Sequence, residues 1–104
     1  MVVDQAIAGV ELEAKKKVRR GRRLHLSARV VDKQGENIVA VVPVHLEVFD
    51  TDGQLAEYSG YYGARDGELE VALDIAKNDT KGEWTLRLAE LASGSSTERV
   101  LTVR

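Results

Sequence analysis

The sequence contains no cysteine, a single proline and no long run of hydrophobic residues. Without cysteine the chain has no disulfide framework, no thiolate metal site and no cysteine nucleophile. No segment approaches the roughly 20 consecutive apolar residues of a membrane-spanning helix, so we expect no such span. The N-terminal residues MVVDQ lack the basic and apolar regions of a signal peptide. A chain of 104 residues suits one domain, residues 1–104, with one modest core.

Charge is unevenly distributed along the chain. The sequence has 15 basic and 17 acidic residues, which gives a formal net charge of −2. Seven of the basic residues lie close together: Lys15, Lys16, Lys17, Arg19, Arg20, Arg22 and Arg23. The rest of the chain is strongly acidic, so we expect an acidic body with one basic corner.

Hydrophobic residues alternate with polar ones along most of the chain, which indicates half-buried β-strands. The segment 67–76 is the clearest, with Leu69, Val71 and Leu73 separated by acidic or small residues. We predict seven strands, at about residues 8–14, 24–32, 42–50, 54–62, 67–76, 83–90 and 97–104. Turn sequences such as Asp-Thr-Asp-Gly at 50–53 separate them. This spacing is typical of an all-β fold, an immunoglobulin-like antiparallel β-sandwich of about seven strands.

The apolar side of each alternating segment gives the predicted core. It comprises Leu26, Ala28, Val30, Val44, Leu46, Val48, Leu69, Val71, Leu73, Ile75, Trp84, Leu86, Leu88 and Val103. Trp84 leads the apolar face of its strand, so we expect the indole to be buried.

Four sequence features, read in order, carry a resemblance to a known family. They are V-R-R-G-R-R-L-H-L at 18–26, V-V-D-x-x-G at 30–35, V-x-L-E-V-F-D-T-D-G at 44–53 and K-G-E-W-T-L at 81–86. They resemble bacterial immunoglobulin-like sandwich modules, especially the macroglobulin-type domains of the α2-macroglobulin family. The sequence has no cysteine-containing thioester motif and no long bait-like loop. The resemblance therefore implies a structural module with no catalytic residues to carry over.

The basic stretch 15–23 is the first candidate binding site. Its clustered cations could bind a polyanion such as nucleic acid, a heparin-like glycan or an anionic surface. If the stretch is extended, it spans nearly 30 Å at ~3.3 Å per residue. The alternative is a solvated turn between two strands, with Val18 pointing inward and Gly21 making the turn. No aromatic residue interleaves with these cations, so we expect no specific nucleic-acid recognition.

Tyr58, Tyr61 and Tyr62 form the second candidate site. Exposed aromatic rings stack on sugar rings, so this segment could bind carbohydrate. In an extended strand Tyr58 and Tyr62 share one face and Tyr61 takes the other. The alternative is that one or two of the rings complete the core and cover a sheet edge.

Residues that could hold a metal ion are few. The two histidines, His25 and His45, lie on the polar sides of their strands. On neighbouring strands they could hold zinc together with a carboxylate such as Glu47. The turn at 50–53 begins like a calcium-binding loop, but Tyr61 occupies the position of its bidentate glutamate. We predict no metal site and no cofactor.

Sequence signals for catalysis are also missing. The chain has no G-x-S-x-G, no S-x-x-K and no phosphate-binding loop motif. Acidic side chains along 67–76 lie about 7 Å apart at two-residue steps, a spacing compatible with glycosidase pairs. A strip of like charges on a strand is also an ordinary solvated face that opposes aggregation. We predict no catalytic residues and no enzyme activity.

The sequence therefore favours a non-catalytic structural or interaction module within a larger exported multidomain protein, extracellular or periplasmic. Its partners would be neighbouring domains of that protein or another protein, bound in part by strand addition at an exposed edge. The alternative is a glycan- or polyanion-binding module that uses the basic turn 15–23 or the tyrosine segment 58–62, with a polysaccharide as its partner.

Overall fold

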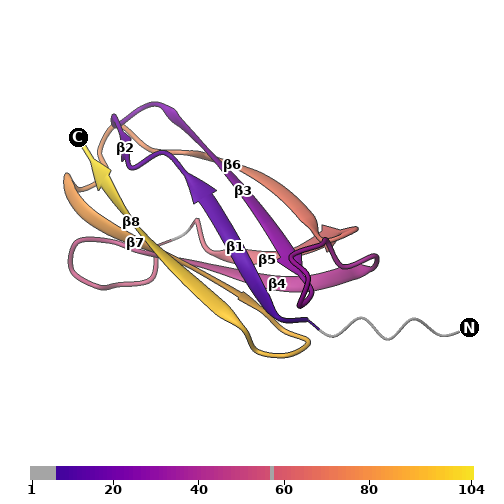
Figure 1. Ribbon diagram of the computed structural model, residues 1–104. Coiled ribbons are helices and arrows are strands. Elements are labelled where there is room, and N and C mark those ends of the chain that lie inside the picture. Colours follow the sequence, from indigo (N-terminus) through magenta and orange to yellow (C-terminus); the bar gives the residue numbers. More distant parts are fainter. Residues whose placement is uncertain (1–6, 57) are drawn as a thin grey trace, which may run out of the picture.

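The computed structural model describes residues 7–56 and 58–104, and this part of the chain consists of strands and loops (Figure 1). The strands are β1 (Gly9–Ala14), β2 (Lys17–Val18), β3 (Arg23–Val31), β4 (Val41–Phe49), β5 (Gly60–Arg65), β6 (Glu68–Asp74), β7 (Gly82–Glu90) and β8 (Ser96–Val103). Their order in the sheet is β1-β3-β6-β5-β4-β7-β8-β2. Neighbouring strands are antiparallel, except that β2 runs parallel to β8.

The sheet is folded over into two layers. β1, β3 and β6 form one layer, while β5, β4, β7 and β8 form the other. The β5–β6 hairpin links them through one paired position, Arg65 opposite Glu68. β1 contacts β7 and β8 across the interior, and β2 joins the edge of β8. This arrangement confirms the predicted immunoglobulin-like β-sandwich.

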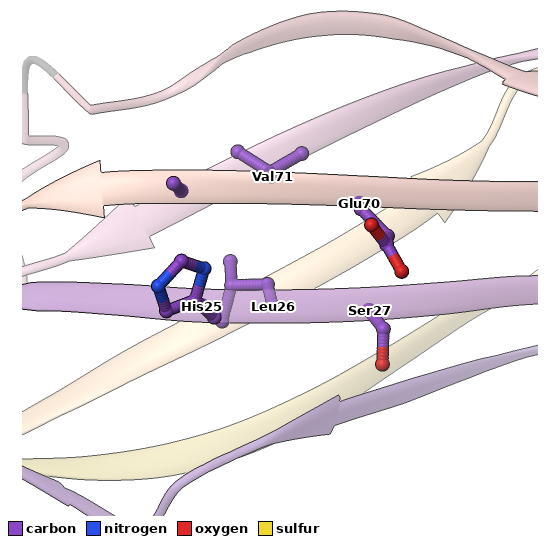
Figure 2. Close-up of a pocket in the computed structure, with 6 residues that line it drawn as sticks. His25, Leu26, Ser27, Glu70 and Val71 are labelled. Atoms are coloured by element: carbon purple, nitrogen blue, oxygen red, sulfur yellow. The ribbon is translucent and has the colours of Figure 1, made fainter.

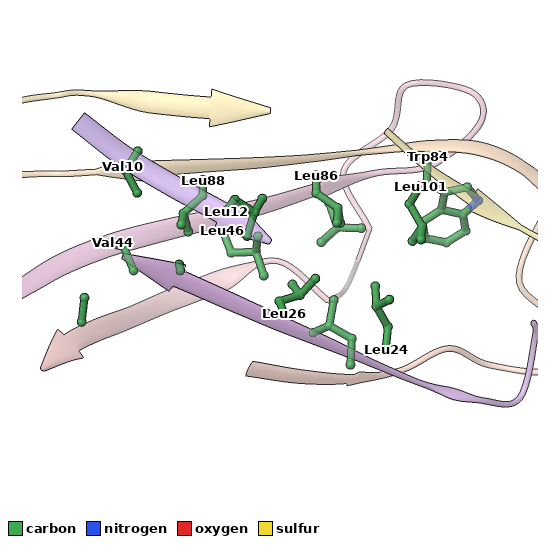
Figure 3. Packing of buried hydrophobic residues seen from close by; sticks show 14 of the residues in the cluster. Val10, Leu12, Leu24, Leu26, Val44, Leu46, Trp84, Leu86, Leu88 and Leu101 are labelled. Carbon is green, nitrogen blue, oxygen red and sulfur yellow. The ribbon is translucent and has the colours of Figure 1, made fainter. Parts of the chain in front are cut away.

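The alternation of the sequence places the core between the layers (Figure 3). Along β3 every second residue from Leu24 to Val30 is buried, and the residues between them are exposed. Twelve of the fourteen predicted core residues are buried. Leu69 and Val71 are only half-buried, because β6 has β3 on one side but meets β5 at a single position on the other.

The structure differs from the predicted strands in two ways: one predicted strand is shorter, and one strand was not predicted. The expected strand 54–62 begins only at Gly60, where β5 starts. The described residues before it, 54–56 and 58–59, return to β4: the N–H of Ala56 donates to Val48 O at 2.7 Å, and the N–H of Val48 donates to Ser59 Oγ at 3.0 Å. These bonds satisfy backbone groups that a paired strand would otherwise have engaged. The additional strand, β2, lies inside the basic stretch.

Candidate functional site

The basic stretch 15–23 is not one extended ribbon. It contains β2 and then a tight turn in which the N–H of Arg22 donates to Arg19 O at 3.1 Å. Gly21 takes the third position of this turn with φ of +81°, a value that favours glycine. Val18 is buried beneath it. Of the two arrangements that the sequence left open, the structure shows the turn, and the stretch does not span 30 Å as one ribbon.

The cations of this stretch separate into groups. Arg23 begins β3, and its Nε donates to Asp74 Oδ1 on β6 at 2.8 Å. This hydrogen bond and the guanidinium charge hold the pKa of Asp74 below its ordinary value. The lysines at 15–17 line a groove beside Arg99 of β8. Arg22 is exposed in the turn just before β3.

Arg19 and Arg20 line a different depression at the pole where β8 ends. We call it the basic hollow, and its lining consists of Arg19, Arg20, Lys77, Lys81 and Arg104. Lys77 and Lys81 come from the β6–β7 loop, and Arg104 follows β8. The sequence analysis missed these last three residues, because each stands outside the basic stretch and only the topology brings them to Arg19 and Arg20.

The three tyrosines do not share one exposed surface. Tyr58 is half-buried before β5, and its ring is tilted against the indole of Trp84 with 6.3 Å between centroids. Its hydroxyl donates to the carboxylate of Asp79 and accepts from the N–H of Ala76 at 3.0 Å. Tyr62 is half-buried and packs against the core. Tyr58 and Tyr62, two of the three predicted carbohydrate-binding residues, therefore pack against the interior of the sandwich.

Tyr61 points outward from β5 and is 73% exposed. Its ring stacks on the imidazole of His45 on β4, with centroids 4.2 Å apart and 10° between the planes. Carbohydrate binding at Tyr61 stays a prediction. His25 lies on β3 in the other layer, so the two histidines are not on neighbouring strands as a shared zinc site requires.

A shallow pocket on the outer face of β3 and β6 contains a histidine, a serine and a glutamate, the residue types of a catalytic triad (Figure 2). His25, Ser27 and Glu70 line it together with Leu26 and Val71. A serine nucleophile needs a hydrogen bond to its base. Among the described residues no hydrogen bond joins Ser27 to His25 or to Glu70. His25, Ser27 and Glu70 are all exposed on this sheet face.

Several carboxylates are engaged in building loops. Asp32 and Asp50 begin two loops of the same design, each with glycine at the fourth position. In both, Oδ1 of the aspartate accepts the backbone N–H groups two and four residues later, at 2.9 and 3.0 Å. The turn at 50–53, which begins like a calcium loop, thus uses its first carboxylate for its own backbone.

Glu90 plays the same part in the β7–β8 connection, where it is fully buried. Its carboxylate accepts the N–H of Ser93 at 2.9 Å, the N–H of Ser95 at 2.8 Å and the Ser93 hydroxyl. Burial opposes the charge of Glu90, but these hydrogen bonds outweigh it and place the pKa below its ordinary value. The ionised carboxylate is therefore a structural group of this turn.

The described part of the chain contains no group of three or more His, Cys, Asp or Glu side chains placed to hold a metal ion. No helix long and apolar enough to cross a membrane occurs in that same part.

Comparison with known proteins gives a fold and no family. No family model matches the chain, and no curated protein matches its sequence. Solved structures do match it along most of its length. A superoxide reductase (neelaredoxin) from Ignicoccus hospitalis has a TM-score of 0.66 at 11% identity, with 94% of this chain and 82% of that chain covered.

Two further solved structures are individual modules. The CARDB domain of a Pyrococcus furiosus protein, solved in complex with di-metal ions, has a TM-score of 0.61 at 11% identity and covers 92% of this chain and 86% of its own. The PKD domain of an M14-like peptidase from a Thermoplasmatales archaeon has a TM-score of 0.55 at 14% identity, with 91% and 92% covered. At these identities the likeness is one of fold: the chain is an immunoglobulin-like β-sandwich.

Proposed function

We propose that the chain is a non-catalytic interaction module that spaces and orients its neighbours within a larger exported protein. One observation carries this proposal: the chain passes through the sandwich from pole to pole. Gly9 of β1 pairs with Val31 at one pole, whereas Val103 of β8 pairs with Gly82 at the other. A nine-residue strand such as β3 is about 30 Å long, which is the separation that the sandwich would impose.

The positions of the charged groups with shifted pKa values support a non-catalytic role. Catalytic residues are commonly charged groups with perturbed pKa values in a cleft. Here the perturbed groups are Glu90, which holds a turn, and the Arg23–Asp74 pair on the surface. Among the described residues every buried side-chain nitrogen or oxygen has a hydrogen-bond partner.

The likeness to modular domains supports a place in a larger protein. Similar structures include CARDB and PKD domains, and the sequences of the turn at 30–35 and of the strand entry at 81–86 resemble those of macroglobulin-type domains. We propose that this chain is an extracellular or periplasmic module whose partners are adjoining domains or another protein.

Intact mass spectrometry of the natural gene product, captured from its source cells by antibody, tests this proposal. We expect a species far above the 11.4 kDa of this sequence, with further folded domains in the same polypeptide. A single species near 11.4 kDa would show that the sandwich acts alone and would overturn the spacer role.

A further inference from the structure

The basic hollow unites cations from three parts of the chain. Arg19 and Arg20 lie in the β2–β3 turn, Lys77 and Lys81 in the β6–β7 loop, and Arg104 beyond β8. In Figure 1 the β2–β3 turn, the β6–β7 loop and the end of β8 meet at one pole. The sequence separation of these segments means that the charge concentration is a product of the fold.

Backbone hydrogen bonds hold the three parts in place. The N–H of Gly21 donates to Ile75 O at 2.7 Å, and the N–H of Ile75 donates to Arg22 O at 3.0 Å. These bonds join the β2–β3 turn to the end of β6. The N–H of Arg20 donates to Arg104 O at 2.9 Å, which joins the same turn to the end of β8. The hollow therefore has a rigid backbone frame.

Lys77 is positioned by a glycine. A Cβ at Gly21 would lie 3.0 Å from Cγ of Lys77, so the aliphatic part of that lysine packs over the turn. Packing of the stem leaves the ammonium group at its end free to face solvent. Glycine at this position thus allows both the positive φ of the turn and the close approach of the Lys77 side chain.

The cations of the hollow are not engaged in ion pairs within the described part of the chain. The carboxylate of Asp79, in the same loop as Lys77, instead accepts from the Tyr58 hydroxyl and the Ala76 N–H. Arg20 reaches only the backbone oxygen of Asp79, at 3.5 Å. Like charges held together in this way favour an anionic ligand.

The positive surface continues beyond the hollow. Val18 is buried, so its neighbours Lys17 and Arg19 both project from the opposite, outer side of the chain. The lysines at 15–17 and Arg99 line the groove along β8, beside one carboxylate, that of Glu13. A linear anion could therefore contact the hollow and the groove together.

We propose that the basic hollow binds an acidic polysaccharide, with guanidinium groups of Arg19 and Arg20 on its sulfate or carboxylate groups. Single-stranded nucleic acid fits less well, because no aromatic side chain lines the hollow or the lysine groove for a base to stack on. The rings of Tyr58 and Trp84 contact each other, and Trp84 is buried. This inference does not rest on the spacer role, since either can fail without the other.

The test removes two charges from the part of the hollow that lies outside the basic stretch. The variant Lys77→Gln/Lys81→Gln is compared with Lys33→Gln/Arg65→Gln, which lowers the net charge equally through exposed cations elsewhere. Binding is measured calorimetrically for a heparin oligosaccharide, a size-matched oligouronate, neutral dextran and a DNA duplex. At 0.15 M salt, screening over about 8 Å suppresses attraction by net charge alone.

We expect wild type to bind heparin, the oligouronate or both, and to bind neither dextran nor DNA as tightly. The hollow variant should bind about ten-fold more weakly, while the matched variant stays within about two-fold of wild type. A preference for heparin over the oligouronate would assign sulfate rather than carboxylate as the recognised group.

Three results would overturn the proposal: no binding to either acidic glycan, equal weakening in both variants, or tighter binding to DNA. If Lys77→Gln/Lys81→Gln fails to fold, Arg19→Gln in the exposed turn is compared with Lys33→Gln, which removes the same charge, and a wild-type-like affinity of Arg19→Gln would overturn the proposal.

Discussion

Trp84 is the largest buried side chain of the sandwich and joins apolar packing to one polar contact. It is 2% exposed, and its indole Nε1 donates to Thr80 O at 2.8 Å. The ring also meets Tyr58, whose hydroxyl lies in the hydrogen-bond group of Asp79 and Ala76. Trp84 therefore links the core to the loop that carries two lysines of the basic hollow.

We expect Trp84→Ala to lower the free energy of unfolding by about 3–5 kcal/mol, because it leaves a large cavity and frees the Thr80 carbonyl. Thermal denaturation followed by circular dichroism measures this loss. Trp84→Phe keeps most of the ring and is the control, with a clearly smaller loss. An unchanged melting temperature for Trp84→Ala would show that the indole does not pack as described.

The buried carboxylate of Glu90 leads us to expect that stability depends on pH. The folded-state pKa of the Glu90 carboxyl is lowered, so ionised Glu90 stabilises the fold at pH values above the pKa of the unfolded state. That stabilisation is lost as pH falls through the lower folded-state pKa. Glu90→Gln should therefore cost about 1–3 kcal/mol at pH 7. The difference from wild type should shrink as the solution is acidified below pH 4.

Urea denaturation of both proteins between about pH 3 and pH 7 measures this effect. Glu36→Gln, at an exposed loop position, is the control and should match wild type throughout. A stability difference between Glu90→Gln and wild type that is the same at every pH would contradict a structural role for the Glu90 charge.

At the scale of elements, the β5–β6 hairpin fixes where the sheet folds over. Its two-residue loop is Asp66-Gly67, with φ of +51° and +74°, the pattern of a type I′ turn. A Cβ at Gly67 would lie 2.8 Å from both Ile38 N and Val30 O. The loop is thus packed against the backbone of the β3–β4 connection.

We expect Gly67→Ala to destabilise the protein by more than Gly35→Ala. Gly35 has a similar φ of +79°, but no atom lies within 4 Å of the added Cβ. Gly35→Ala therefore measures left-handed backbone strain alone, about 1–2 kcal/mol. The excess for Gly67→Ala, measured by urea denaturation, reports the clash with Ile38 and Val30. Equal losses would mean that the hairpin has room for a side chain.

Alternation predicted β3, β4, β6, β7 and β8 to within about two residues, because one buried and one exposed face leave a period of two in the sequence. The same reasoning failed for the described residues 54–56 and 58–59. There, the Ser59 hydroxyl and the Ala56 amide serve as the partners of Val48, which no pattern of hydrophobicity reveals. β2 has only two residues, too few for any period to show.

For a related reason, only part of the basic hollow could be predicted from the sequence. A run of cations at 15–23 is evident in the sequence, and its turn at Gly21 was one of two readings. Lys77, Lys81 and Arg104 are unremarkable until the strand order brings the β6–β7 loop and the end of β8 to that turn. Contacts between distant segments are what a single sequence does not display.

At the scale of the whole molecule, the cations of one pole are gathered in the basic hollow, while the rest of the chain has more acidic than basic residues. On the outer face of β1, β3 and β6, Arg29 instead binds Glu11 at 3.3 Å and Asn37 at 2.8 Å, and Asn37 binds Glu68 at 3.0 Å. A cation of that face is therefore tied to a carboxylate, unlike the cations of the basic hollow.

One core is shared by both layers, so we expect unfolding to be a single cooperative transition. Ile38→Val tests this expectation, because Ile38 is 5% exposed near the β5–β6 hairpin, at the pole opposite Trp84. The substitution should lower stability by about 0.5–1.5 kcal/mol. Trp84 fluorescence and far-ultraviolet circular dichroism should show the same shift in urea midpoint. A fluorescence midpoint unchanged from wild type, beside a lowered dichroism midpoint, would mean that the two poles unfold separately.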